Sequence, residues 1–233
     1  MNDDTSGGTA PSAPLATTVA GQGPALLLAH GATGNTADNF GPIMGALTAR
    51  RTVIAPDYPG SGSTPRDPHP LDLDDLADRL VAAADRAGAR TFPVLAFSMG
   101  TQVAIRAAAR HPERVEALVL SAGLAVAEGE NRRTFEAWRA EIAAAGPPFD
   151  PPGALDHVDL LLSNDVRGDL ASIDVPVLVI KTLKDELVLP GNSDELAAGI
   201  RGARIAELST GHLIWEEDAE GWERLVTGFL DEL

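Results

Sequence analysis

Short apolar runs alternate along the chain with stretches in which apolar residues recur at helical spacing. The runs predict strands near residues 15–20, 25–30, 52–56, 92–97, 115–120, 175–180 and 203–208. The periodic stretches predict helices near residues 38–49, 71–87, 99–110, 192–201 and 218–231. Because strands that alternate with helices build parallel sheets, the pattern predicts an α/β fold.

A serine stands between the fourth predicted strand and the helix after it. Residues 96–100 read A-F-S-M-G, and the strand ends directly before Ser98. A strand that turns at a serine straight into a helix predicts a nucleophile elbow, which needs small residues such as Ala96 and Gly100 at its sharp turn. The Ser98 hydroxyl is then expected to be exposed at a helix N-terminus, where unpaired N–H groups stabilise negative charge. The alternative interpretation is a serine that only caps the helix.

A serine nucleophile requires a base, for which histidine is the natural choice. The chain has five histidines: His30, His69, His111, His157 and His212. Only His212 follows a late predicted strand, at 203–208, and precedes the terminal helix. The other four stand in an early loop, in a turn, at a helix end and in a Pro-rich region. We therefore predict that His212 is the base, with a structural loop histidine as the alternative.

The third group, an acid, must lie at the carboxyl edge of the sheet, where open α/β sheets bind their ligands. Asp185 follows the predicted strand 175–180 on that side. The aspartates that precede this strand would lie at the opposite edge. Asp185 is the predicted acid, and its neighbour Glu186 is the alternative.

The order Ser98, Asp185, His212 resembles that of the α/β-hydrolase fold superfamily. Other segments of the chain are similar to that family as well: H-G-A at 30–32, D-Y-P-G-S-G at 57–62, and G-H followed by Glu216 at 211–216. The likeness extends from about residue 25 to the end of the chain. The family's G-x-S-x-G pattern has Ala96 at its first position here, which adds one methyl group.

This resemblance implies an α/β-hydrolase fold, a mostly parallel central sheet flanked by helices with a short helical cap. It implies that Ser98 is the nucleophile, His212 the base and Asp185 the residue that orients the base. It also implies an oxyanion hole formed by the backbone N–H groups of Ala32 and Met99. In that case the side chains at these two positions are of secondary importance.

One long segment, about residues 122–172, separates two of the predicted strands. Segments of this length carry their own structure or function in compact domains. Phe135 and Trp138 fall at helical spacing within it, so the segment predicts a short, mainly helical cap, with an ordinary surface excursion as the alternative. Phe135, Trp138 and Trp215 are the candidates for lining a substrate pocket. Packing between cap and core is the alternative role for the first two.

Length and composition set the organisation of the chain. Its 233 residues suit one domain over 15–233, and the acidic, Gly-, Ser- and Pro-rich residues 1–14 predict a flexible tail. No apolar run approaches the 18 residues of a membrane span. The absence of cysteine excludes disulfides and thiolate metal sites and fits a cytoplasmic protein. No metal site is apparent.

The chain is strongly acidic, with 34 acidic against 18 basic residues and a net charge of −16. Such a field repels nucleic acid and anionic membranes, so neither is an expected partner. Solubility is the favoured explanation of the charge. The pattern leaves the oligomeric state open.

These features together predict a serine hydrolase that cleaves a small carboxylic ester, lactone or thioester through an acyl-enzyme on Ser98. No cofactor is needed for this chemistry. A carbon–carbon bond hydrolase and a cofactor-free lyase, cyclase or perhydrolase are the alternatives on the same fold, because function depends on the pocket. An inert binding protein is a further alternative, against which the complete triad argues.

Overall fold

The computed structural model describes residues 13–233, so nearly all of the expected tail at 1–14 lies outside the described residues. The described part forms a seven-stranded sheet in the order β1-β3-β2-β4-β5-β6-β7. Its strands are β1 (Thr17–Ala20), β2 (Ala25–Ala29), β3 (Thr52–Pro56), β4 (Phe92–Phe97), β5 (Val115–Ser121), β6 (Val177–Thr182) and β7 (Arg204–Leu208). β1 runs antiparallel to β3 at one edge, and the other neighbouring strands are parallel.

The register of the sheet brings the carboxyl ends of its central strands together. β2 and β4 pair Ala29 with Ala96, one residue before the end of β4. β6 and β7 pair Thr182 with Leu208. The loops that follow β2, β4, β6 and β7 therefore leave the sheet at the same edge, which is where parallel α/β sheets place their sites.

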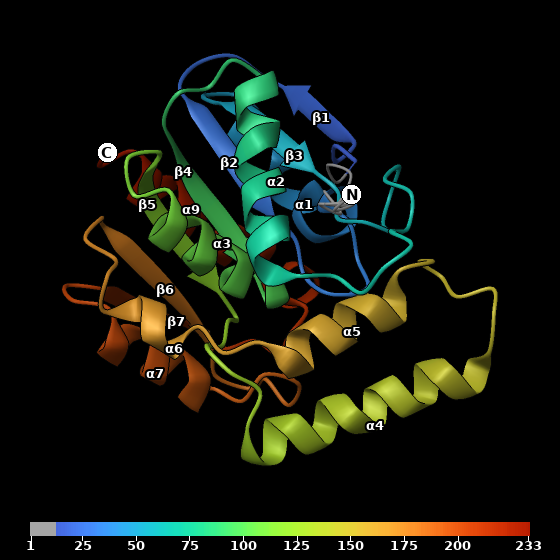
Figure 1. Cartoon of the computed structure of the whole chain (residues 1–233). Coiled ribbons are helices and arrows are strands. Elements are labelled where there is room, and N and C mark those ends of the chain that lie inside the picture. The colour runs from blue at the N-terminus through green and yellow to red at the C-terminus, as the bar shows by residue number, and fades with distance from the viewer. Residues whose placement is uncertain (1–12) are drawn as a thin grey trace, which may run out of the picture.

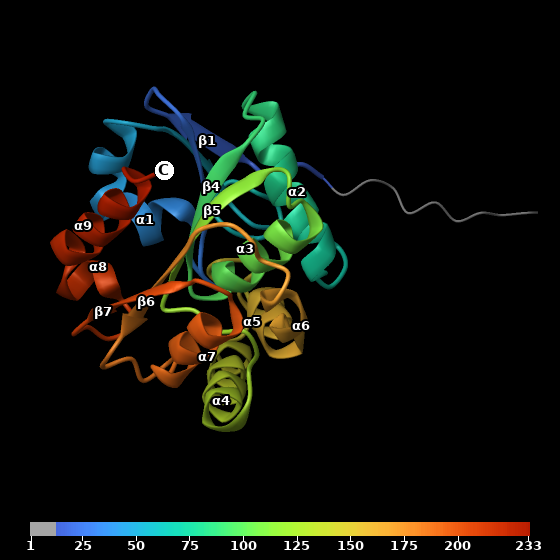
Figure 2. The same cartoon turned by 90° about the vertical axis from the view of Figure 1, so that its left-hand side faces the viewer.

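Helices cover both faces of the sheet. They are α1 (Thr36–Thr48), α2 (Leu73–Arg86), α3 (Met99–Arg110), α4 (Gly129–Ala145), α5 (Ala154–Ser163), α6 (Arg167–Leu170), α7 (Gly191–Gly199), α8 (Ile214–Glu217) and α9 (Ala219–Leu230). One hydrophobic cluster joins α1, α8 and α9 to the sheet, and the other joins α2, α3, α6 and α7 to its opposite face. Figure 2 shows these two groups of helices on either side of the strands.

The helices of the long segment between β5 and β6 are α4, α5 and α6. Figures 1 and 2 show α4 and α5 side by side at one end of the molecule, away from the antiparallel edge strand β1. We call α4 and α5, with the turn that joins them, the cap. No helix within residues 13–233 is long and apolar enough to cross a membrane.

One predicted strand begins later than expected, and one short helix was not predicted. The strand expected at 175–180 is β6, which begins at Val177. Pro176 cannot donate to a sheet ladder, so it stands before the strand. The helix expected at 218–231 is α9, and the short helix α8, which the pattern did not predict, precedes it. Asp218 separates the two helices: its φ of −152° is extended, and its side chain caps α9 by accepting from the Gly221 N–H. The remaining predicted strands and helices are confirmed within a few residues at their ends.

Candidate active site

Ser98 stands at the sharp turn between β4 and α3. Its φ of 53° and ψ of −124° lie in a region that L-residues rarely adopt. Its N–H donates to the Ser121 carbonyl at 2.9 Å, which ties the turn to β5. A Cβ at Gly100 would lie 2.1 Å from the Ala29 carbonyl oxygen, so only glycine lets α3 begin this close to β2. The strained turn is thus held from both neighbouring strands.

Ser98 is less exposed than the sequence predicts. The residue is 6% exposed. A Cβ built on Gly31 would contact the Ser98 side chain at 3.3 Å, and His212 is hydrogen-bonded to the hydroxyl. The loop after β2 and the loop after β7 therefore lie against the Ser98 side chain, which a strand-turn-helix pattern could not reveal.

Three side chains distant in the sequence form one line of hydrogen bonds. Ser98 Oγ lies 3.0 Å from His212 Nε2, and His212 Nδ1 lies 2.7 Å from Asp185 Oδ2. A carboxylate oxygen accepts, so Nδ1 carries the proton of the neutral ring, and Nε2 is left as an acceptor facing the serine hydroxyl. This is the arrangement in which an imidazole can take a proton from a serine.

Asp185 is held in one orientation. It is 2% exposed. Its Oδ1 accepts from the Leu187 and Val188 N–H groups, and its Oδ2 accepts from Thr182 Oγ1 at 2.9 Å as well as from His212. Because both oxygens are occupied, the carboxylate cannot turn away from the imidazole. Glu186, the alternative acid, is exposed.

The loop after β2 contains Ala32, the first predicted oxyanion-hole residue. His30 is fully buried and donates from Nδ1 to the Gly31 carbonyl at 2.7 Å, while its Nε2 accepts from the Tyr58 N–H at 2.8 Å. Burial lowers the pKa of His30 to about 3, so the ring is neutral and both of these roles are satisfied. The Gly31 N–H donates to Asn39 Oδ1 at 2.8 Å.

The second half of this loop is anchored to the turn after β3. Ser61 Oγ donates to the Gly34 carbonyl at 2.5 Å. The N–H and hydroxyl of Thr36 both donate to Asp57 Oδ1, at 2.9 and 2.8 Å. The loop is therefore fixed along its length by side chains of two other segments.

Two backbone N–H groups beside this frame have no partner within residues 13–233. The amides of Ala32 and Met99 donate to none of the described residues. Met99 is the first residue of α3, so its N–H points out of the helix N-terminus. Both amides are thus available to a substrate oxygen.

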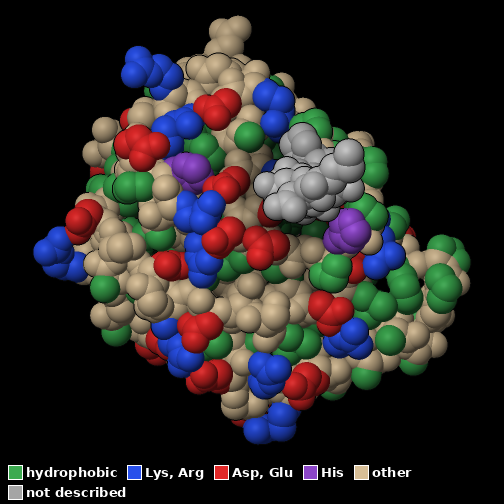
Figure 3. Space-filling model, in the orientation of Figure 1, with side chains coloured by type: hydrophobic (Ala, Val, Ile, Leu, Met, Phe, Trp, Pro, Cys, Tyr) green, Lys and Arg blue, Asp and Glu red, His purple; other side chains and the backbone are tan. Residues whose placement is uncertain are grey.

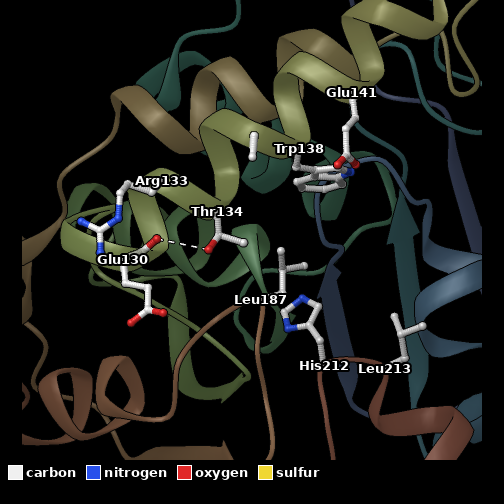
Figure 4. Close-up of a pocket in the computed structure, with 9 residues that line it drawn as sticks. Glu130, Arg133, Thr134, Trp138, Glu141, Leu187, His212 and Leu213 are labelled. Atoms are coloured by element: carbon white, nitrogen blue, oxygen red, sulfur yellow. Dashed lines mark hydrogen bonds between the residues drawn. The ribbon is translucent and has the colours of Figure 1, made fainter.

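The cap leaves two cavities, and Trp138 lines both. The larger, of about 740 Å³, includes His212, Leu187 and Leu213. Figure 4 shows Trp138 on α4 facing the His212 ring across it, with Leu187 beside that ring. The smaller, of about 370 Å³, includes Thr33 and the apolar part of the turn between α4 and α5.

The other two pocket candidates lie elsewhere. Phe135 is 1% exposed and packs into the hydrophobic core on the inner side of α4, so it lines neither of these cavities. Trp215 packs edge-on against Phe97, with ring centroids 4.9 Å apart, and against Trp222. Phe135 therefore has the packing role that was its alternative, because helical spacing does not tell which face of an amphipathic helix meets the core. Trp215 lines neither of these two cavities.

A sequence profile described as "alpha/beta hydrolase fold" matches residues 24–150, more than half of the chain. The chain belongs to the α/β-hydrolase fold family. The predicted fold class is confirmed by this match and by the mostly parallel sheet.

Two relatives of this α/β hydrolase carry the names of hydrolytic enzymes. It is 33% identical to the pyrrolizixenacetamide deacetylase of Xenorhabdus hominickii, over 90% of this chain and 92% of that protein. It is 30% identical to the putative carbamate hydrolase RutD of Azorhizobium caulinodans, over 91% of this chain and 93% of that protein. The α/β-hydrolase family and these relatives identify the chain as an enzyme, a hydrolase.

A solved structure shares the fold of this α/β hydrolase. The enol-lactonase from Burkholderia xenovorans LB400 superposes with a TM-score of 0.82 and is 22% identical, covering 93% of this chain and 96% of that chain. At that identity the likeness concerns the fold alone.

Sequence reasoning missed several residues of the hydrolase site. Glu217, the residue after the glutamate of the G-H-x-x-x-E match, accepts from the Gly211 N–H at 2.9 Å beside His212. Asn39 binds the loop after β2 and Thr182 binds Asp185, through side chains that no motif marks. His157 of the cap reaches the same loop. Within residues 13–233 no group of three or more His, Asp or Glu side chains is placed to hold a metal ion.

Proposed function

We propose that this α/β hydrolase cleaves a small carboxylic ester, lactone or thioester through an acyl-enzyme formed on Ser98. The observation that carries the proposal is the line of hydrogen bonds from Asp185 through His212 to Ser98, beside two unpaired amides. A nucleophile, a base, a group that orients the base and donors for an oxyanion are the parts that acyl transfer requires.

In the first half-reaction Ser98 Oγ attacks the acyl carbon while its proton passes to His212 Nε2. The carbonyl oxygen becomes an oxyanion, which accepts from the N–H groups of Ala32 and Met99. Asp185 holds the ring and stabilises its charged form. His212 then gives the proton to the leaving oxygen or sulfur, and the carbon–heteroatom bond breaks.

The second half-reaction uses the same groups on water. His212 takes a proton from water, the hydroxide attacks the acyl carbon, and the proton returns to Ser98 Oγ as the acid leaves. Ser98, His212, the substrate and one water molecule account for every bond made and broken, and Asp185 and the two amides stabilise the charges that develop. The proposed reaction therefore uses a small-molecule substrate, water and no cofactor.

The two cavities support a compact substrate. The leaving group must lie within reach of the proton on His212 Nε2, so we place it in the larger cavity, which His212 lines. The acyl group then points towards the smaller cavity beside Thr33, whose volume of about 370 Å³ suits a short chain. The larger cavity carries Glu130 and Glu141 against one cation, Arg133, which does not favour polyanionic leaving groups.

The relatives favour a second candidate reaction on the same groups. One is named as the deacetylase of an acetamide and the other as a putative carbamate hydrolase. Cleavage of a small amide or carbamate would use the same acyl transfer to Ser98, with the proton of His212 delivered to a leaving nitrogen. The deacetylase also supports a short acyl group such as acetyl.

Labelling with a fluorophosphonate probe tests the proposal. The wild-type chain should be labelled at one site and should hydrolyse short-chain esters. Ser98→Ala should lose both the labelling and the hydrolysis while keeping its circular-dichroism spectrum. Ser172→Ala is the matched control, because Ser172 is exposed at the end of α6 and should be labelled no differently from wild type. Equal labelling of the wild type and Ser98→Ala would overturn the assignment.

A further inference from the structure

His157 lies on the cap but is bonded to the oxyanion loop. It is fully buried on α5. The Thr33 N–H donates to its Nδ1 at 3.1 Å, and its Nε2 lies 2.9 Å from the Pro59 carbonyl. An amide N–H can only donate and a carbonyl can only accept, so Nδ1 is the acceptor and Nε2 carries the proton. Burial lowers the pKa of His157, which keeps the ring in this neutral form.

The position of Thr33 gives this bond its importance. Thr33 has a φ of 58°, a left-handed conformation that a β-branched residue rarely adopts. Such a conformation persists only where the surroundings hold it. The bond from the Thr33 N–H to His157 is the contact that holds this peptide from the cap side.

Two imidazoles hold the two peptide planes on either side of Ala32. His30 Nδ1 binds the Gly31 carbonyl, and in a trans peptide the N–H of the next residue, Ala32, points the opposite way. His157 binds the N–H of Thr33, in the peptide that follows Ala32. The direction of the Ala32 N–H is thus set by His30 from the sheet and by His157 from the cap.

The start of α5 is fixed to the turn after β3, and this contact fixes the position of His157. The Gly153 N–H donates to the Gly60 carbonyl at 3.0 Å. A Cβ at Gly153 would lie 2.6 Å from the Pro59 carbonyl oxygen, which shows how closely the two backbones approach. Beside this contact Asp156 pairs with Arg66.

We propose that His157 is a positioning residue, which aims the Ala32 N–H at the substrate oxyanion by holding the Thr33 amide from the cap. The inference rests on the proposed function, because it takes Ala32 as an oxyanion donor. It makes this part of the cap a component of the catalytic frame as well as a cover for the substrate.

Two substitutions separate the two bonds of His157. Asparagine carries its side-chain oxygen near the position of Nδ1, so His157→Asn keeps an acceptor for Thr33 and loses the donor to Pro59. Glutamine reaches the position of Nε2, so His157→Gln keeps the donor and loses the acceptor. Asp156→Asn is the control on the same helix, since it weakens the ion pair with Arg66 without touching the oxyanion loop.

We expect His157→Gln to lower kcat for a short-chain ester by about 10²-fold, the lower end of the loss caused by removing an oxyanion donor. Its KM should change little, because the oxyanion forms only in the transition state. His157→Asn should keep kcat within a few-fold of wild type, and Asp156→Asn should leave both constants unchanged. Equal losses of kcat in the Asn and Gln variants, or no loss in the Gln variant, would overturn the proposal.

Measurements on the wild-type chain distinguish a failure of this inference from a failure of the proposed function. If wild type neither hydrolyses esters nor reacts with the phosphonate, the proposed function fails and the role of His157 falls with it. If wild type is active and His157→Gln is equally active, only the role of His157 fails.

Nitrogen-15 NMR of the wild-type chain provides a test that does not depend on the folding of variants. The Thr33 amide should exchange slowly with solvent, and the His157 ring should carry its proton on Nε2. A freely exchanging Thr33 amide, or a proton on Nδ1, would mean that the bond is absent and the proposal is wrong.

Discussion

At the scale of single residues, the site depends on a carboxylate that cannot turn. Asp185 accepts from two backbone N–H groups, one hydroxyl and one imidazole, so its direction is fixed. Hydrogen bonds to charged groups are among the stronger ones in proteins. The imidazole of His212 is thereby kept in the tautomer that leaves Nε2 free to accept a proton.

We therefore expect Asp185→Asn to lower kcat by about 10⁴-fold, because an amide can donate to Nδ1 and favour the wrong tautomer. The adjacent Glu186→Gln is the matched control and should change kcat little, since Glu186 is exposed. Steady-state hydrolysis of a short-chain ester measures both. A loss of activity in Glu186→Gln with Asp185→Asn nearly silent would reverse the two assignments.

At the scale of elements, the cap shapes the space above the triad. α4 places Trp138 between the cavity that reaches His212 and the cavity beside Thr33. α5 is tied to the turn after β3 by backbone contact and by His157. The size of the acyl group that the enzyme accepts should therefore depend on the indole of Trp138.

Removing that indole should enlarge the space for the acyl chain. We expect Trp138→Ala to raise the ratio of kcat/KM for hexanoyl over acetyl esters by about tenfold, the order of discrimination that one methylene produces in an apolar pocket. Glu136→Gln is the control, because Glu136 is exposed on the same helix and pairs with Arg132 outside these cavities. An unchanged ratio in Trp138→Ala would show that the indole does not limit the acyl chain.

At the scale of the whole molecule, charge is distributed and partly paired. Figure 3 shows acidic and basic side chains interspersed over the face that carries α2 and α3. Ion pairs cross between these helices, among them those of Arg106 with Asp74 and of Arg110 with Asp78. Exposed pairs of this kind contribute little stability individually. The pH dependence of folding is therefore expected to reflect buried groups more than these pairs.

His30 is a buried group that should make the stability of the fold depend on pH over a defined pH range. Its pKa is lowered by burial from 6.5 to about 3 in the folded chain. Between these values the unfolded chain binds a proton that the folded chain does not, so stability falls as the pH decreases from 6.5 towards 3. Above 6.5 the ring is neutral in both states and contributes no such dependence.

Urea unfolding at several pH values should reveal this effect. The free energy of unfolding of wild type, relative to that of His30→Gln, should decrease by about 1.4 kcal/mol for each unit by which the pH falls between 6.5 and about 3. Glutamine keeps an acceptor for the Tyr58 N–H but does not titrate. His69→Gln, at an exposed histidine, should follow the wild-type profile. Parallel profiles for wild type and His30→Gln would contradict the buried, neutral state of His30.

The sequence by itself determined the order of strands and helices and the identity of the three residues that meet at the site. Apolar periodicity is local, so it marked β2, β4 and α3 within a few residues. Ser98, Asp185 and His212 could be found because each follows a predicted strand, and parallel strands bring their carboxyl ends to one edge.

Only the tertiary structure decided what surrounds these residues. Phe135 and Trp138 both belong to the apolar pattern of α4, yet Phe135 packs into the core and Trp138 lines the cavities. The bond between His157 and Thr33 joins positions 124 residues apart, and nothing in the local sequence of either residue marks it. Periodicity records that a helix has an apolar face. The packing of distant segments determines which side chain on that face meets the core, the cavities or the loop after β2.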